Sequence, residues 1–147
     1  MDSACSSFHS FVRSKSGQFT SFDPPGALNG AAFAVNPSGT VCGYYVTPAQ
    51  PAVLQGYLLT RGVFTTIAFS PGAWTYCGAI NPEGTVTGGY LDSGGVQHGY
   101  IYYHGVFTSF DVPGSTATQP AGINPSGIIV GLYLDSGGVE HGFVRTP

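Results

Sequence analysis

The chain has 147 residues with 4 Lys and Arg against 7 Asp and Glu, a formal net charge of −3. Four basic side chains are too few for a general nucleic-acid surface, and 14% aromatic residues are untypical of a disordered chain. No apolar run approaches the roughly 20 residues of a membrane helix, and residues 1–5 lack the basic start of a signal peptide. We therefore expect one β-rich domain over residues 1–147, with no nucleic-acid and no membrane partner.

A repeated segment organises the chain. The motif Asn-Pro-x-Gly starts at Asn36, Asn81 and Asn124, at spacings of 45 and 43 residues, and each copy is followed by a short apolar strand. Pro presets φ at the second turn position and Gly closes the turn, so the motif predicts a tight turn between two strands. Further turns are predicted at Asp-Ser-Gly-Gly, Gly-Val and Pro-Gly, which gives four strands per repeat.

Taken in chain order, the repeats predict a partial blade, two whole blades and another partial blade of a β-propeller. Their ranges are residues 1–26, 27–70, 71–113 and 114–147. The strand counts are two, four, four and three, because the chain begins in the third strand of a repeat and ends in the third strand of another. The two end strands are near duplicates, His-Ser-Phe-Val-Arg at 9–13 and His-Gly-Phe-Val-Arg at 141–145.

The composite motif also resembles a known family. His-Gly-Phe, Phe-Thr-x-Phe-Asp-x-Pro-Gly and Gly-Ile-Asn-Pro-x-Gly-x-Ile-Val-Gly-x-Tyr are similar to the bacterial extracellular HAF-type repeat. The resemblance covers nearly the whole chain. It implies an all-β propeller of four-stranded antiparallel blades and a bacterial extracellular location. A β-trefoil, which also has three four-strand repeats at this length, is the alternative fold.

Three blades cannot close a ring, and open ends would expose apolar faces and unpaired strand edges. A homodimer removes both problems, because two chains with twofold symmetry give a six-bladed ring. The N-terminal fourth strand is then expected to complete a blade that the three C-terminal strands begin, and the sequence leaves open whether this blade is shared between two chains or closed within one. One third strand is left over, and the sequence does not say where it lies.

Acidic and histidine residues recur at one end of the predicted blades. Repeat one replaces the aspartate with Thr47 and the histidine with Gln55, so the two residue types are lost together and are expected to interact. One interpretation is a structural hydrogen bond that fixes a turn. The other is a divalent metal or acid–base site, because imidazole and carboxylate are common ligands. The candidate metal ligands are His9, His98, His141, Asp92 and Asp135.

The first strand of each blade is expected to line the central channel and offers candidate ligand-binding residues. These are Trp74, Tyr76, Asn29 and Thr118. Trp74 and Tyr76 have no aromatic counterparts in the other repeats, so they are either packing residues between blades or a stacking platform for a sugar or apolar ligand.

Three functions remain open from the sequence. The first is a binding module for a carbohydrate or other small molecule. The alternative is an enzyme, a divalent-metal-dependent hydrolase of an ester, lactone or phosphoester at the propeller mouth, by analogy with six-bladed propeller hydrolases of the paraoxonase and gluconolactonase type. The third is a scaffold without a small ligand.

The cysteines carry little signal, because Cys5, Cys42 and Cys77 are odd in number and have no Cys-x-x-Cys spacing. We interpret them as small buried apolar residues. The alternatives are a nucleophilic Cys77, a disulfide between chains or a lone ligand.

Overall fold

The computed structural model describes residues 8–49 and 52–147, and Cys5 lies outside this part. Within it, thirteen strands form four antiparallel sheets of two, four, four and three strands, the counts that the turn motifs predicted. The all-β fold is therefore confirmed. The described residues include no helix long and apolar enough to cross a membrane. That the sheets are propeller blades stays a prediction at this point.

Each sheet is built from strands that follow one another along the chain. The first pairs β1 (Ser10–Arg13) with β2 (Phe19–Phe22). The second contains β3 (Asn29–Val35), β4 (Val41–Val46), β5 (Leu54–Thr60) and β6 (Val63–Ile67). The third contains β7 (Thr75–Ile80), β8 (Val86–Leu91), β9 (Gln97–Tyr103) and β10 (Val106–Phe110). The fourth contains β11 (Ala117–Ile123), β12 (Ile129–Leu134) and β13 (Glu140–Arg145).

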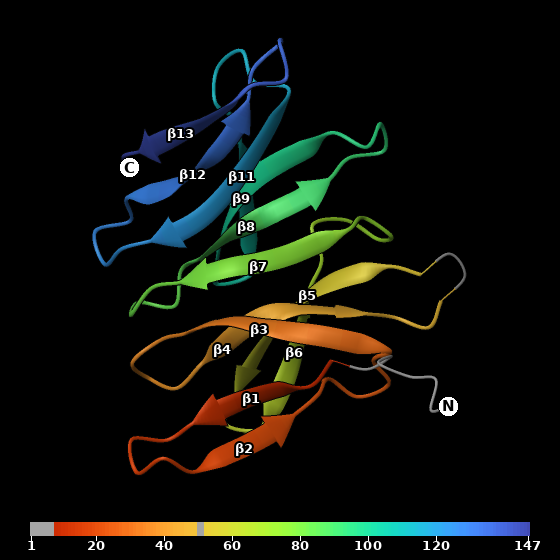
Figure 1. Ribbon diagram of the computed structural model, residues 1–147, viewed down its shortest axis with the longest axis vertical. Coiled ribbons are helices and arrows are strands. Elements are labelled where there is room, and N and C mark those ends of the chain that lie inside the picture. Colours follow the sequence, from red (N-terminus) through yellow and green to blue (C-terminus); the bar gives the residue numbers. More distant parts are fainter. Residues whose placement is uncertain (1–7, 50–51) are drawn as a thin grey trace, which may run out of the picture.

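The four sheets are stacked in chain order, with the first sheet and β13 at opposite ends of the stack (Figure 1). Strand β7 lies against β4 and β5 of the preceding sheet, and β11 lies against β8 and β9. Among the described residues, strand pairing joins successive strands of one sheet, and none of these sheets closes into a barrel. The β-trefoil alternative, which needs a barrel, is therefore wrong.

The Asn-Pro-x-Gly turns form as predicted. Gly39, Gly84 and Gly127 have φ of 84°, 86° and 75°, a region that favours glycine. The asparagine side chain closes each turn: Asn81 Oδ1 accepts the Thr85 amide at 2.8 Å.

The same asparagines link the sheets to one another. Asn36 Nδ2 donates to the carbonyl of Asn81 at 3.2 Å, and Asn81 Nδ2 donates to the carbonyl of Asn124 at 3.4 Å. Asn36 and Asn81 are buried, whereas Asn124 is exposed. The described residues provide no acceptor for Asn124 Nδ2, so this ladder of amides ends at the fourth sheet with a free donor.

A bulge in the first strand of each larger sheet requires glycine opposite it. The register of β7 against β8 shifts between Cys77 and Ala79, which brings the Tyr76 carbonyl against Gly88. A Cβ at Gly88 would overlap that carbonyl oxygen. Gly43 and Gly131 stand in the same place in the second and fourth sheets, so the glycine of this motif is a packing requirement.

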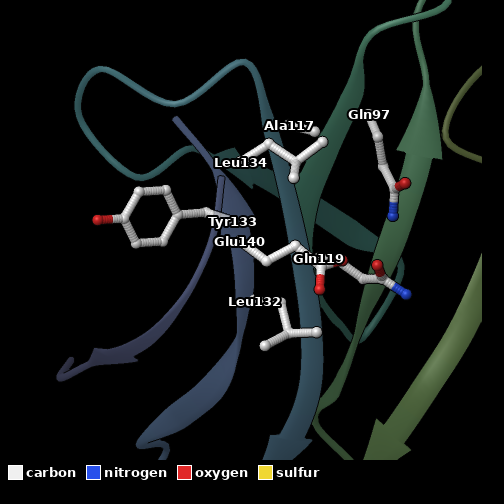
Figure 2. Close-up of a pocket in the computed structure, with 7 residues that line it drawn as sticks. All are labelled: Gln97, Ala117, Gln119, Leu132, Tyr133, Leu134 and Glu140. Carbon is white, nitrogen blue, oxygen red and sulfur yellow. The ribbon is translucent and has the colours of Figure 1, made fainter. Parts of the chain in front are cut away.

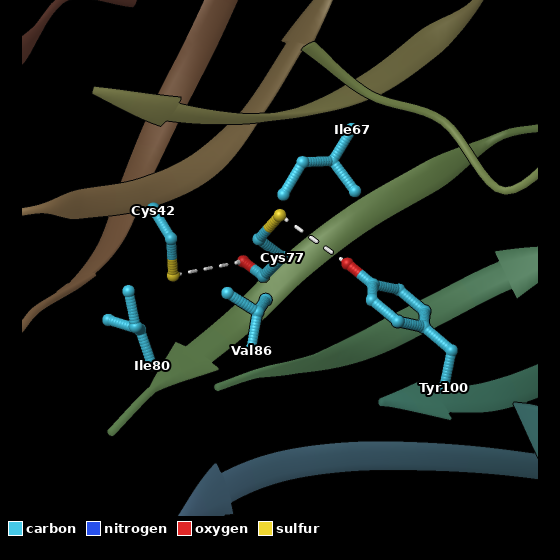
Figure 3. Close-up of a cluster of buried hydrophobic side chains, with 6 residues drawn as sticks. All are labelled: Cys42, Ile67, Cys77, Ile80, Val86 and Tyr100. Carbon is cyan, nitrogen blue, oxygen red and sulfur yellow. Dashed lines mark hydrogen bonds between the residues drawn. The ribbon is translucent and has the colours of Figure 1, made fainter. Parts of the chain in front are cut away.

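The core lies between the second and third sheets (Figure 3). Cys42, Cys77 and Tyr100 are fully buried there with Ile67 and Val86. Tyr100 Oη donates to Cys77 Sγ at 3.4 Å, and burial raises the pKa of the Cys77 thiol to about 12. The interpretation of Cys42 and Cys77 as buried apolar residues is confirmed, and a thiol with this pKa is no nucleophile at neutral pH.

Candidate functional site

An open groove of about 410 Å³ separates the loop that precedes β7 from the turn that joins β8 to β9. Trp74 forms one side and is 49% exposed, a large exposed fraction for an indole. Its carbonyl accepts the Leu91 amide at 2.9 Å, which fixes the loop to the end of β8. The residues that line the groove are Ser70, Pro71, Gly72, Ala73, Trp74, Leu91, Asp92, Ser93 and Gly95.

Asp92 also lines this groove and has one acceptor position left. Its Oδ1 accepts the amides of Gly94 at 2.8 Å and Val96 at 2.9 Å, which fills both lone pairs of that oxygen. Among the residues that the structure describes, its Oδ2 accepts from the His98 ring alone, at 3.2 Å. The Val96 amide, followed by the His98 ring, holds the pKa of Asp92 below its usual 3.8. Asp92 is therefore an ionised carboxylate that can accept one further hydroxyl group.

His98 lies between two carboxylates. Its Nε2 is hydrogen-bonded to Asp92, and its Nδ1 is 2.9 Å from Asp111 Oδ2. When both carboxylates are ionised, both ring nitrogens must donate, which makes the ring an imidazolium. Partial burial lowers the pKa of His98, but the two aspartates outweigh burial and raise this pKa above its usual 6.5. A ring held in this way has no lone pair for a metal ion.

Parts of the same arrangement recur in the end sheets. His141 Nε2 is 2.9 Å from Asp135 Oδ2, and His9 Nδ1 is 2.7 Å from Asp23 Oδ2. The predicted contact between the aspartate and the histidine of one turn is therefore confirmed for Asp92–His98 and Asp135–His141. Among residues 8–49 and 52–147, no group of three or more His, Cys, Asp and Glu side chains could hold a metal ion. The geometry favours the structural interpretation of these pairs.

Replacing His98 tests this structural role. His98→Gln should lower the free energy of unfolding by about 1 kcal/mol, because one amide cannot hold both carboxylates. Repeat one carries Gln55 at this position, so the variant should fold. Urea denaturation measures the loss. A variant that folds normally but loses a stoichiometric metal would contradict this account.

The same contacts set an expected pH dependence of stability. The contribution of His98 is complete below its usual pKa of 6.5 and is lost as the pH rises through its raised pKa. The contributions of Asp92 and Asp135 are complete above 3.8 and are lost as the pH falls through their lowered pKa values. The melting temperature should therefore be highest between these limits. In His98→Gln the decline on the alkaline side should shrink.

The other predicted ligand-binding residues do not line the Trp74 groove. Thr118 is fully buried, and its hydroxyl is bonded to the Val112 amide and to Ser115. Burial raises the pKa of Tyr76 to about 12, and its Oη accepts Gln97 Nε2 at 2.9 Å. Asn29 begins β3, in another sheet. The structure instead adds Ser70 and Ser93, which were not among the predicted site residues.

A second cavity lies between the third and fourth sheets, where Gln97 and Gln119 lie near Glu140 (Figure 2). Its volume is about 60 Å³, whereas a water molecule occupies roughly 30 Å³ of liquid. This cavity has room for water but not for a sugar or a substrate. The Trp74 groove is the larger of the two by a wide margin.

The groove thus combines a half-exposed indole, an ionised carboxylate with a free acceptor position and two serine hydroxyls on turns whose backbone is fixed by hydrogen bonds. It offers stacking and hydrogen bonding, and its one carboxylate is held by a histidine and not presented as an acid–base pair. No family model, no curated protein and no solved structure matches this chain.

Proposed function

We propose that this protein is a carbohydrate-binding module, and the observation that carries the proposal is that the half-exposed Trp74 and the Asp92 carboxylate line the same open groove. A sugar ring has an apolar C–H face and a rim of hydroxyl groups. Indole stacks on the first, and ionised carboxylates and serine hydroxyls bind the second. The groove supplies both kinds of contact at one place.

The groove is specific to one repeat. In the fourth sheet Ala117 stands where the third has Trp74, although Asp135 and Ser136 keep the turn, and in the second sheet Asn29 stands there and Thr47 replaces the aspartate. Each chain therefore provides one complete site. Weak single sites of this kind gain avidity when an assembly presents several of them.

We further propose that the sheets are propeller blades and that two chains close a six-bladed ring. Both ends of the stack support this proposal. Phe11 is 59% exposed, whereas Tyr57 and Tyr100 at the equivalent positions are fully buried. Val130 is 46% exposed, whereas Cys42 and Thr87 are fully buried. Together with the free Asn124 donor, these faces are built to be covered by a further sheet, and the ring gives two Trp74 grooves per dimer.

A glycan array probed with the purified protein tests the binding function, with and without a chelator. We expect binding to a restricted set of glycans that survives chelation, because no contact in the groove needs a metal. Isothermal titration with a glycan found on the array then gives the number of sites, which should be one per chain. No glycan binding, or turnover of an ester or lactone that a chelator abolishes, would contradict the proposal and favour the hydrolase.

A further inference from the structure

The outer strand of the fourth sheet has an unpaired edge. In the second and third sheets a fourth strand, β6 or β10, pairs with β5 or β9, but no described strand pairs with the free edge of β13. The Asp–His contacts are incomplete at the same place. His98 Nδ1 is bonded to Asp111 at the end of β10, whereas His141 Nδ1 has no acceptor among the described residues.

The missing strand and the missing carboxylate both have equivalents at the other end of the chain. Strand β2 and Asp23 carry the Phe-Thr-Ser-Phe-Asp sequence of β10 and Asp111. In its own chain β2 pairs with β1, and Asp23 binds His9. Figure 1 places β2 and β13 at opposite ends of the stack, so β2 cannot reach β13 of the same chain.

Strand β1 is a close copy of β13. Phe11, Val12 and Arg13 pair with β2, and β13 has Phe, Val and Arg in the same order. Exchanging one strand for the other therefore changes the pairing with β2 at a single position, Ser10 against Gly142.

At that position the structure favours β13. Ser10 is buried at this position, and its hydroxyl lies beside the hydroxyl of Tyr57. Gly56 and Gly99, the equivalent residues of β5 and β9, have no space for a Cβ because the next sheet lies against them. Gly142 has open space around it, its nearest neighbour being the Gly131 carbonyl oxygen at 4.0 Å. Gly142 is therefore the residue type that close packing against a next sheet requires, but in this chain no next sheet contacts it.

Strand β1 also leaves space beside β3. Grooves of about 230 Å³ and 340 Å³ lie between β1 and β3. Most of their lining residues are apolar, and Arg13, His9 and Ser10 are the polar exceptions. Phe33 and Val35 of β3 are 54% and 57% exposed. In the middle of the stack, two strands of the preceding sheet, β4 and β5, lie against β7, which is the equivalent of β3. A whole sheet fits against β3 better than the single strand β1.

We infer that β13 of a second copy displaces β1 from β2, so that β11, β12 and β13 of one chain and β2 of its partner form a four-stranded sheet in which the partner's Asp23 binds His141 Nδ1. The inference rests on the proposed two-chain ring. It specifies the four-stranded sheet through which the two chains join, and this sheet is called the joint below. Pairing with β2 is nearly unchanged by the exchange. Burial of Val130, Phe33 and Val35 drives it, because these side chains gain a neighbouring sheet. The twofold axis produces the same joint twice.

Two cysteine pairs distinguish the exchanged joint from the unexchanged one. By the register of β2 with β1, Thr20 lies opposite Val12, and after exchange it lies opposite Val144 of the partner. Facing residues of antiparallel strands are within reach of a disulfide. The background is Cys5→Ser, because Cys42 and Cys77 are buried. Thr20→Cys with Val144→Cys should give a covalent dimer on oxidation. Thr20→Cys with Val12→Cys should lock β1 in place, hold the oxidised protein at the mass of one chain and restore the dimer on reduction.

Histidine variants give a second measurement. His141→Gln should raise the dimer dissociation constant about tenfold, because each joint loses a charge-assisted hydrogen bond. His9→Gln, the matched control, should not weaken the dimer, because His9 gives up Asp23 on exchange.

The outcomes separate the joint from the ring and from glycan binding. The exchange is overturned if the Thr20–Val144 cysteine pair gives no covalent dimer and the protein remains a dimer when Thr20 and Val12 are crosslinked. This result would leave the two-chain ring standing. A wild-type mass of one chain overturns both and assigns the edge of β13 to another occupant. Glycan binding through Trp74 is measured separately from the two crosslinks and from the mass of the wild-type protein.

Discussion

Trp74→Ala should weaken glycan binding about 30-fold, equivalent to about 2 kcal/mol, because a stacked aromatic side chain at the centre of a small site carries much of its affinity. Trp74→Phe should recover part of the loss, since a smaller ring retains a stacking face. Titration calorimetry with the glycan selected by the array gives both affinities. The melting temperature should change less than in a core variant, because Trp74 is 49% exposed and is not part of the buried core cluster.

Tyr103→Ala is the matched control for this variant. Tyr103 is an aromatic residue of similar exposure, 45%, and lies at the other end of β9, outside the lining of the groove. Its loss should leave affinity unchanged. Equal losses of affinity in the two variants would show that binding depends on general surface aromatics, and would remove the Trp74 groove as the site.

Gly88→Ala should lower the free energy of unfolding by about 3 kcal/mol, because the new Cβ overlaps the Tyr76 carbonyl and backbone must move to admit it. The bulge of β7 at Cys77–Ala79 creates this close approach, so side-chain rotation cannot relieve it. Denaturant unfolding at a fixed protein concentration measures the loss, since the stability of the proposed dimer would depend on concentration.

Gly122→Ala provides the contrast within the same motif. A Cβ at Gly122 would meet only Val130 Cγ2, at 3.2 Å, and Ala34 and Ala79 occupy the equivalent position in the other sheets. We expect a change within about 0.5 kcal/mol, because alanine also reduces the entropy of the unfolded chain. If both variants were equally stable, the bulge would not constrain Gly88 and this description of the β7–β8 pair would be wrong.

Much of the fold was predictable from sequence because turn chemistry is local. Asn-Pro-x-Gly and the other turns mark strand ends wherever they occur, so strand number and grouping follow from counting them. The Asp–His contact was predictable for a different reason. Repeat one loses both residues together, at Thr47 and Gln55, and a repeat protein supplies its own comparison.

The site was harder to predict because it depends on packing between segments. Trp74 and Asp92 come together only because the Leu91 amide binds the Trp74 carbonyl and ties the loop before β7 to the end of β8. Tyr76 looked equivalent to Trp74 in the sequence, yet it packs against Gly89 and binds Gln97, which takes it out of the groove. Thr118 is also absent from the groove, because its buried hydroxyl accepts the Val112 amide.

The mass of the protein in solution tests the central claim, that two chains close one ring, most directly. Light scattering on the purified wild-type chain at micromolar concentration should give twice the 15.2 kDa of one chain. The exposed faces of the end sheets, the free edge of β13 and the open Asn124 donor are the features that a second copy would cover in the proposed ring. A homogeneous species at 15.2 kDa would contradict the ring.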